Sequence, residues 1–563
     1  MRRSARRLTA LLIGAATVTA MLAGCVGIPM SGTVSQGDEI TDDITIETGF
    51  RPSGPREGAT QQELLVDFIQ AATNPQNDYQ TARSFLAKSI RSKWNPDAGV
   101  SIRRSGGTPT VVSDDVLDYT ITTSARIDAD GRYTEDTDLG SQTLEFGFVK
   151  EGGEWRLNRL DDGIVLSEDN FDVVFTSHAL YFFDPTYTYL VPDVRWFPNS
   201  ARLATRIASA LVKGQAGWLA QGVLVSEFPT GTTLGDVVTV TSGTATVDLS
   251  EEVREASNAQ RERMRQQLSA SYANVRTISS VVLTIGGVPL PINETGAAQA
   301  IKQPLVDPSP LVRFEDEFGF VSNGALTPLQ PISDGIVAIN AGAASLGAGK
   351  STAVARASDG VYVVSASGVD PLLIDDRTGL INPSIDTTSF IWSARRASTA
   401  SITVFRPTGE PFPVDTSTLP SDATLVSMDV SRDGTRILLY LSTDNGPILG
   451  VAGIIRQENS VPDRLGEFVQ LPIDRFAPID ATWVGPEMIA TLSLNGSNAV
   501  VTTHEIGGPS EVIGRVANGR SIVGGNGGTD GLWVLTDDGD LYKPRGNSWQ
   551  KTGTTASFIA TQQ

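Results

Sequence analysis

The chain is poor in the residues on which several enzyme classes depend. Its 563 residues include one cysteine and two histidines, His178 and His504. A single cysteine excludes an intramolecular disulfide and a cysteine-rich zinc site, and two histidines leave little for metal or acid–base chemistry. The chain has 44 basic and 64 acidic residues, which gives a formal charge of −20. Because a phosphate backbone calls for a basic surface, this balance argues against nucleic acid as a partner.

Long hydrophobic runs are also scarce. The apolar stretch Leu8–Ala23 follows four arginines in residues 2–7, and its 16 residues fall short of the roughly 20 that a membrane span needs. That length is typical of the apolar core of a signal peptide. The whole chain is 40% apolar, which allows a real core, and its length suggests about three or four domains.

The one cysteine stands at the end of this apolar stretch. Leu22-Ala23-Gly24-Cys25 resembles the bacterial lipobox, in which the cysteine is lipidated and the chain is cut just before it. We therefore predict a lipoprotein signal peptide over residues 1–24, cleavage between Gly24 and Cys25, and S-diacylglycerol and N-palmitoyl groups on Cys25. The alternative is an ordinary signal peptide, or an uncleaved anchor, with a chance cysteine.

Lipidation would place the protein on the extracytoplasmic face of the cell membrane, held by acyl chains. Residues 25–58, rich in Gly, Ser, Thr, Pro and acids, are then expected to be a lipidated tether. The mature chain would lose four arginines and no acid, which moves the formal charge from −20 to −24. A body this acidic is not expected to lie flat on anionic lipid.

Residues 59–166 are predicted to form an α+β domain. A capping box, Thr60 with Glu63, precedes apolar residues at helical spacing, and a second helix is expected from about Asp78. The period then switches to two, with a hairpin turn at Gly152-Gly153. Helices followed by a long hairpin resemble the NTF2-like fold, which hosts isomerases and dehydratases as well as binding modules. The range contains no histidine, so we interpret it as a structural or docking module.

Residues 170–290 are predicted to form an α/β domain. A helix is expected over 203–211 and is closed by Gly214. The strand ending in Val247-Asp248-Leu249-Ser250 leads into a long helix capped by Ser250, and a β-rich segment over 275–285 follows. This order resembles the GerMN domain of spore-germination and cell-envelope proteins. The alternative is simply a strand that runs into a helix cap.

Residues 310–563 are predicted to be all-β. Short β-runs alternate with turn signals such as Asp359-Gly360, Asp433-Gly434 and Asp538-Gly539. Their spacing fits degenerate repeats of about 40–50 residues, the length of a β-propeller blade, with room for five or six blades. A pair of β-sandwiches is the alternative architecture.

Several motifs imitate catalytic sites. Residues 344–351 look like a relaxed phosphate-binding loop, but Asp359-Gly360 follows too soon for the helix that such a loop must open. No Gly-x-Ser-x-Gly motif is present for a hydrolase serine. We therefore predict no enzymatic activity, no metal site and no bound cofactor apart from the lipid. Adjacent acids of the glycosidase type are attributed to chance in an acid-rich chain, namely Asp42/Asp43, Asp114/Asp115, Asp161/Asp162 and Asp537/Asp538.

Together, the lipobox, the NTF2-like module, the GerMN domain and the C-terminal propeller, in this order, resemble the LpqB lipoproteins of actinobacteria. The resemblance implies an accessory protein of the Mtr two-component system (MtrA–MtrB). Its partner would be the extracellular domain of the membrane sensor histidine kinase, MtrB-like, and its role would lie in cell-envelope homeostasis and division. The alternative function is a cell-wall glycan-binding or glycan-processing envelope protein that contacts peptidoglycan. The sequence assigns no residues to either interface.

Overall fold

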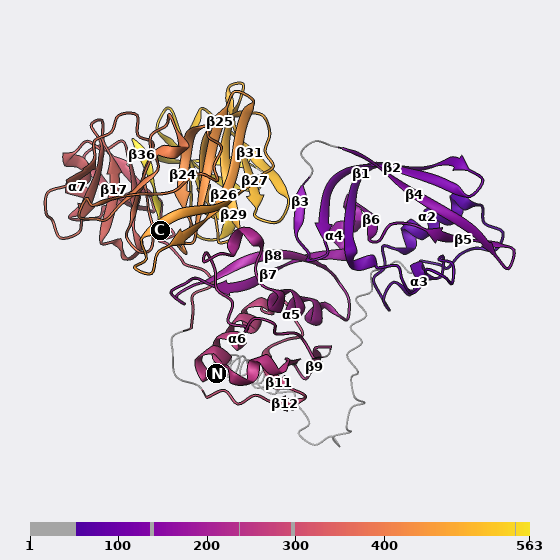
Figure 1. Cartoon of the computed structure of the whole chain (residues 1–563). Coiled ribbons are helices and arrows are strands. Elements are labelled where there is room, and N and C mark those ends of the chain that lie inside the picture. The colour runs from indigo at the N-terminus through magenta and orange to yellow at the C-terminus, as the bar shows by residue number, and fades with distance from the viewer. Residues whose placement is uncertain (1–51, 136–139, 236, 294–298, 547) are drawn as a thin grey trace, which may run out of the picture. The chain divides into compact units, whose positions relative to one another are not determined.

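A computed structural model describes residues 52–135, 140–235, 237–293, 299–546 and 548–563 (Figure 1). The predicted cleavage and lipidation site at Gly24 and Cys25 lies outside the described residues, as does most of the predicted tether. Within the described ranges, no helix is long and apolar enough to cross a membrane. The fold is multidomain and mostly β, with few helices.

The N-terminal domain begins with α2 (Gln61–Ala71) at the predicted capping box. The Glu63 N–H donates to Thr60 Oγ1 at 3.3 Å, and the Thr60 N–H donates to Glu63 Oε2 at 2.9 Å. The second predicted helix is much shorter than expected, because α3 covers only Gln80–Arg83. The chain after it pairs with the sheet, where the Ala87 N–H donates to Leu157 O at 2.7 Å, instead of continuing as a helix.

A six-stranded sheet forms the body of this domain. Its order is β5-β4-β2-β1-β6, β3 pairs with β2, and only the β1–β6 pair is parallel. The predicted Gly152-Gly153 turn joins β4 to β5. Figure 1 shows these long strands beside α2 and α3, whose apolar faces cover the core. The bounds are η1 (Pro96–Ala98), β1 (Gly99–Ser113), β2 (Val116–Asp128), β3 (Tyr133–Glu135), β4 (Ser141–Glu151), β5 (Glu154–Arg159) and β6 (Ile164–Ser167).

The middle domain combines a long antiparallel hairpin, β7–β8, with a four-stranded sheet of order β12-β11-β10-β9. In the sheet β10 and β11 run parallel. The predicted helix that Gly214 closes is α5. The bounds are α4 (Glu168–Val174), β7 (Phe175–Phe183), β8 (Leu190–Pro198), α5 (Leu203–Lys213), η2 (Gly217–Leu219), β9 (Thr239–Thr241), β10 (Thr244–Asp248), η3 (Glu251–Glu255), α6 (Asn258–Ser271), β11 (Ser280–Ile285) and β12 (Val288–Pro289).

The long helix predicted from Ser250 is wrong in its start. Ser250 leads into the short 3₁₀ helix η3, and the backbone turns extended at Ala256 with ψ of 135°. Helix α6 then begins afresh at Ser257, whose hydroxyl accepts the Gln260 N–H at 3.3 Å while the Gln260 side chain accepts the Ser257 N–H at 3.0 Å. Because this second capping box satisfies the helix N-terminus, it outcompetes the signal seven residues earlier.

The C-terminal region is built of four-stranded antiparallel meanders of the β-propeller type, not of sandwiched sheets. Four are separate sheets, and two are joined in an eight-stranded sheet through β36. The predicted Asp-Gly turns precede β18, β25 and β34. The last strand, β36, pairs antiparallel with β13 and parallel with β16, so the C-terminus closes the ring on its first strands.

The elements of this region follow the order of the meanders. They are β13 (Leu311–Phe314), β14 (Glu317–Ser322), β15 (Ala325–Pro328), α7 (Ile332–Ala338), β16 (Ala343–Leu346), η4 (Ala348–Lys350), β17 (Thr352–Arg356), β18 (Val361–Ser365), β19 (Leu372–Asp375), β20 (Ser384–Ile385), β21 (Ile391–Ser393), η5 (Thr399–Ser401), β22 (Thr403–Phe405) and β23 (Pro411–Pro413). The rest are β24 (Thr424–Val430), β25 (Arg436–Thr443), β26 (Gly446–Arg456), β27 (Pro462–Leu471), β28 (Ala477–Trp483), β29 (Met488–Asn495), β30 (Asn498–Glu505), β31 (Ser510–Ala517), β32 (Gly519–Gly524), η6 (Gly528–Gly531), β33 (Leu532–Thr536), β34 (Asp540–Arg545), β35 (Ser548–Thr555) and β36 (Phe558–Gln562).

Buried carboxylates join neighbouring meanders. Asp480 on β28 accepts the Ser427 hydroxyl of β24 at 2.9 Å and the Ser521 hydroxyl of β32 at 2.9 Å. Asp429 on β24 accepts the Ser384 hydroxyl of β20 at 3.2 Å, and burial raises the pKa of its carboxyl to about 6. A buried carboxylate is tolerated only when donors satisfy it, so these residues fix the spacing of adjacent sheets.

Candidate functional site

The phosphate-loop imitation at residues 344–351 is not a nucleotide site. The segment itself contains only the short 3₁₀ turn η4 over 348–350, and strand β17 begins at Thr352, so no helix follows whose N-terminus could face a phosphate. The Lys350 ammonium is already engaged, since Nζ lies 2.8 Å from Asp307 Oδ2 and 4.3 Å from the centre of the Phe320 ring. The structure thus gives this lysine a partner within the fold.

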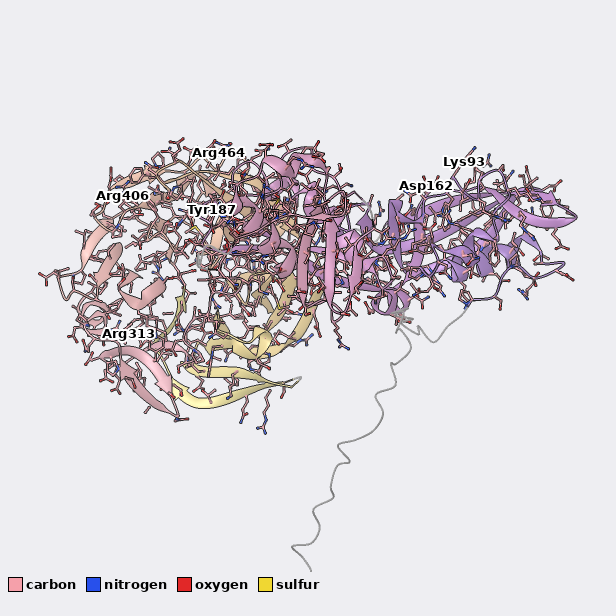
Figure 2. The ribbon with its side chains drawn as sticks, turned by 90° about the horizontal axis from the view of Figure 1, so that it is seen from below. Lys93, Asp162, Tyr187, Arg313, Arg406 and Arg464 are labelled. Carbon is pink, nitrogen blue, oxygen red and sulfur yellow. The ribbon has the colours of Figure 1, made fainter. Side chains whose placement is uncertain are left out.

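The adjacent acids flank turns, as expected. Asp114 and Asp115 lie between β1 and β2, and Asp537 and Asp538 lie between β33 and β34. Asp162, labelled in Figure 2, accepts the Asn95 N–H at 2.8 Å and so fixes the chain ahead of β6. Asp42 and Asp43 lie outside the described residues.

The two histidines lie apart in buried strands. His504 bonds to the hydroxyls of Thr491 and Ser510, each at 3.0 Å, and burial lowers its pKa to about 4. His178 is 5% exposed, neither ring nitrogen has a hydrogen-bond partner, and burial lowers its pKa. No group of three or more His, Cys, Asp or Glu that could hold a metal ion occurs in the part of the chain that the structure describes.

A cavity of about 460 Å³ is here called the junction cavity. It lies among the β3 segment of the N-terminal domain, the β8 and η2 segments of the middle domain, and the ends of β27, β29 and β30. Its wall comprises Arg132, Tyr133, Thr134, Glu135, Pro192, Asp193, Val194, Ala216, Gly217, Trp218, Leu219, Arg436, Glu467, Val469, Gln470, Leu471, Pro472, Glu487, Glu505, Ile506, Gly507 and Gly508.

Two acids lie side by side in this wall. The Ile506 N–H donates to Glu487 O at 2.7 Å, so Glu487 and Glu505 occupy neighbouring ends of the β29–β30 pair. Burial, and then the charge of Glu487, raises the pKa of Glu505 to about 7, and burial also raises the pKa of Glu487. Neither carboxyl forms an ion pair in the described ranges, although the charge of Arg436 offsets part of the rise in the pKa of Glu487.

The basic groups of the wall are already paired. Arg436 Nη2 lies 2.6 Å from Asp433 Oδ2, and its guanidinium lies 5.0 Å from the centre of the Trp483 ring. Arg132 pairs with Asp128 and Asp130. Once these pairs are discounted, the charge left on the wall is that of the glutamates, so the junction cavity is acidic.

Contacts around the cavity hold its walls together. The Trp196 indole N–H donates to Gly507 O at 2.8 Å, and the Trp196 backbone N–H donates to Gly131 O at 2.7 Å. Arg195 pairs with Asp193 inside the middle domain and donates from Nη1 to Asp130 O at 3.0 Å. Gly508 has no room for a side chain, because a Cβ there would collide with the Glu505 carboxylate.

Sequence reasoning did not find this cavity. Glu487 and Glu505 are isolated acids beside β-runs, Arg436 is far from both in sequence, and no local motif joins the three. The one available signal was the Gly507-Gly508 pair after Glu505, which indicates a tight turn at a strand end.

Comparison with known families matches three segments of the chain between residues 54 and 558. Residues 54–172 match the N-terminal domain of lipoprotein LpqB, and residues 311–558 match the LpqB β-propeller domain. Residues 179–291 match a domain described as sporulation and spore germination. The three matches follow one another in the order expected from the resemblance.

Curated relatives carry the description "Lipoprotein LpqB". The protein of Streptomyces avermitilis is 26% identical over 508 residues, which cover 82% of this chain and 81% of the relative. That of Cutibacterium acnes is 28% identical over 288 residues, 51% of this chain and 48% of the relative. That of Mycolicibacterium smegmatis is 33% identical over 224 residues, 37% and 35% respectively. The chain thus spans about half the length of the Cutibacterium relative.

Proposed function

Because the chain belongs to the LpqB lipoprotein family, we propose that it is a non-catalytic, membrane-anchored accessory protein of a two-component sensor kinase. The partner is the extracellular domain of an MtrB-like kinase, and the output is envelope homeostasis and division. The observation that carries the proposal is the succession of three matched domains after a lipobox. None of the descriptions of these domains names a catalytic activity.

The finer architecture belongs to the same proposal. The closing strand β36 is the fourth strand of the meander β13–β15, and β16–β19 form another four-stranded meander. With the four separate sheets, this arrangement supports a propeller of six blades. The curved N-terminal sheet with α2 on its face supports an NTF2-like cone that docks and does not catalyse. Blades and cone then serve as surfaces for a protein partner.

Anchoring follows from Cys25. Acyl groups on the thiol and on the new amino terminus hold the mature body at the extracytoplasmic face of the membrane, and a Cys25→Ala chain has no acceptor for them. Metabolic acyl labelling should mark the wild type and leave Cys25→Ala unlabelled. Labelling and membrane recovery of Cys25→Ala equal to those of the wild type would reject the lipid anchor.

The partner is tested in the membrane where both proteins reside. A photocrosslinker is placed at exposed positions of each domain in the full lipidated chain, and crosslinked products are identified by mass spectrometry. We expect the kinase's extracellular domain among the products and a changed kinase phosphorylation level when the lipoprotein is depleted. Absence of the kinase from every crosslinked position, together with unchanged phosphorylation, would reject the proposal.

A further inference from the structure

We propose that the junction cavity binds a small amine that carries an oxygen acceptor next to its ammonium group, as amino sugars and amino acids do. Glu487 and Glu505 receive the ammonium, and Arg436 donates to the oxygen. This proposal does not rest on the proposed kinase interface. Its argument rests on four properties of the cavity: paired acids, an unsatisfied donor, an acidic balance and a suitable size.

The paired acids define the cationic end of the ligand. Glu487 and Glu505 stand at adjacent strand ends joined by the 2.7 Å bond from the Ile506 N–H to Glu487 O. Neither forms an ion pair with any cation in the described ranges. Two half-buried carboxyls that share a wall repel each other when ionised, and an ammonium between them removes that repulsion and supplies up to three donors.

The unsatisfied donor defines the second end. Arg436 is 1% exposed, and its Nε–H has no hydrogen-bond acceptor among the residues that the structure describes, although Asp433 binds its Nη2. A buried donor without an acceptor costs free energy that an added partner recovers. Because Arg436 forms part of the cavity wall, a hydroxyl or carboxylate oxygen of the ligand is the acceptor that can reach it there.

The charge of the cavity wall and the volume of the cavity restrict the class of ligand further. Arg132 and Arg436 pair with their own aspartates, while Glu135, Glu467, Glu487 and Glu505 form no ion pair within the described ranges, so an anion without an amine is disfavoured. The volume of about 460 Å³ falls in the range of roughly 300–1,000 Å³ that is typical of small-molecule sites. Aromatic rings of Tyr133 and Trp218 add apolar wall for a carbon skeleton.

The test is isothermal titration calorimetry of the full chain with matched probes. Glucosamine is compared with N-acetylglucosamine, which keeps the sugar and loses the ammonium, and lysine is titrated as the amino-acid arm. We expect glucosamine or lysine to bind at least tenfold more tightly than N-acetylglucosamine. Whichever amine binds more tightly identifies the source of the shared chemistry.

Variants locate the site. Glu487→Gln/Glu505→Gln keeps shape and hydrogen-bonding groups, and we expect it to weaken binding of the amine at least tenfold. Glu458→Gln, an exposed acid remote from the cavity wall, is the matched control and should stay within twofold of the wild type. No binding of either amine, equal binding of N-acetylglucosamine, or undiminished binding by a double variant with native melting behaviour would overturn the proposal.

Discussion

At the scale of single residues, the pair of Asp193 and Arg195 is deeply buried. Its side chains are 6% and 1% exposed, and Asp193 also accepts the Ala216 N–H at 2.7 Å. Asp193→Ala leaves the buried Arg195 guanidinium without its carboxylate and with only the hydrogen bond to Asp130 O, and we expect a loss of about 3–5 kcal/mol in the free energy of unfolding. Denaturant titration measures it. Glu145→Ala, which breaks the exposed pair with Arg159, should cost less than about 1 kcal/mol, and equal losses would contradict the burial argument.

Glu505 makes the folded state less stable as the pH rises. Burial and the charge of Glu487 raise its pKa to about 7 from an ordinary value of 4.5, so the folded state holds its proton more tightly than the unfolded state. The resulting contribution is fully present below about pH 4.5 and is lost as the pH rises through 7. We expect the melting temperature of the wild type, measured relative to that of Glu505→Gln, to fall from pH 5 to pH 8.

The neighbouring His504 also titrates, but it does not affect this comparison. Burial lowers the pKa of His504 to about 4, so its effect has the opposite sign and destabilises the fold as the pH falls below about 6.5. His504 is present in both proteins and cancels in the difference between them. Parallel melting curves for wild type and Glu505→Gln across this range would contradict the raised pKa.

At the scale of elements, the ring depends on its last strand. Phe558 on β36 is 5% exposed and lies 5.8 Å, ring centre to ring centre, from Phe318 on β14. Phe558→Ala opens a void where β36 joins β13, and we expect a loss of about 3–5 kcal/mol, measured by denaturant unfolding. Val512→Ala on the exposed face of β31 is the control and should remain within about 0.5 kcal/mol. Matching losses would show that the packing of Phe558 does not stabilise this closure.

At this scale, the features that depend on short sequence motifs were predicted best. The Thr60–Glu63 capping box, the Gly152-Gly153 turn and the Asp-Gly turns each depend on residues close in sequence, and the structure confirms them. The predicted start of α6 was wrong because two capping signals, at Ser250 and Ser257, compete, and only Ser257 forms a capping box. The β7–β8 hairpin was missed because its turn over 184–189 carries no Asn-Gly or Asp-Gly signal.

The candidate site illustrates what no local pattern contains. The junction cavity requires Arg436 on β25, Glu487 before β29 and Glu505 at the end of β30 to meet β3 and β8, which lie hundreds of residues earlier. Each of these residues is ordinary in its own segment. The acidic cavity arises only from the register of the sheets and from the desolvation of the residues that they bring together. Neither can be predicted from the spacing of these residues in the sequence.

At the scale of the whole molecule, Trp196 couples the middle domain to the C-terminal sheets. Its ring lies 4.9 Å from that of Phe171 and 5.7 Å from that of Tyr133, and its indole N–H donates to Gly507 O at 2.8 Å. Trp196→Phe keeps an aromatic ring and removes the donor, so Gly507 O is left without that hydrogen bond. We expect a loss of about 1–3 kcal/mol and faster amide hydrogen exchange around Gly508 and Ser510.

Trp549 is a matched control for this prediction. Its indole nitrogen is buried without any acceptor in the described structure, so Trp549→Phe removes a donor that bonds to nothing. That change should be close to neutral in stability and should leave exchange around Gly508 as it is. If both variants lose the same stability, the cost lies in the smaller ring. If only Trp196→Phe accelerates exchange in the 507–510 turn, the single hydrogen bond to Gly507 holds the junction wall in place.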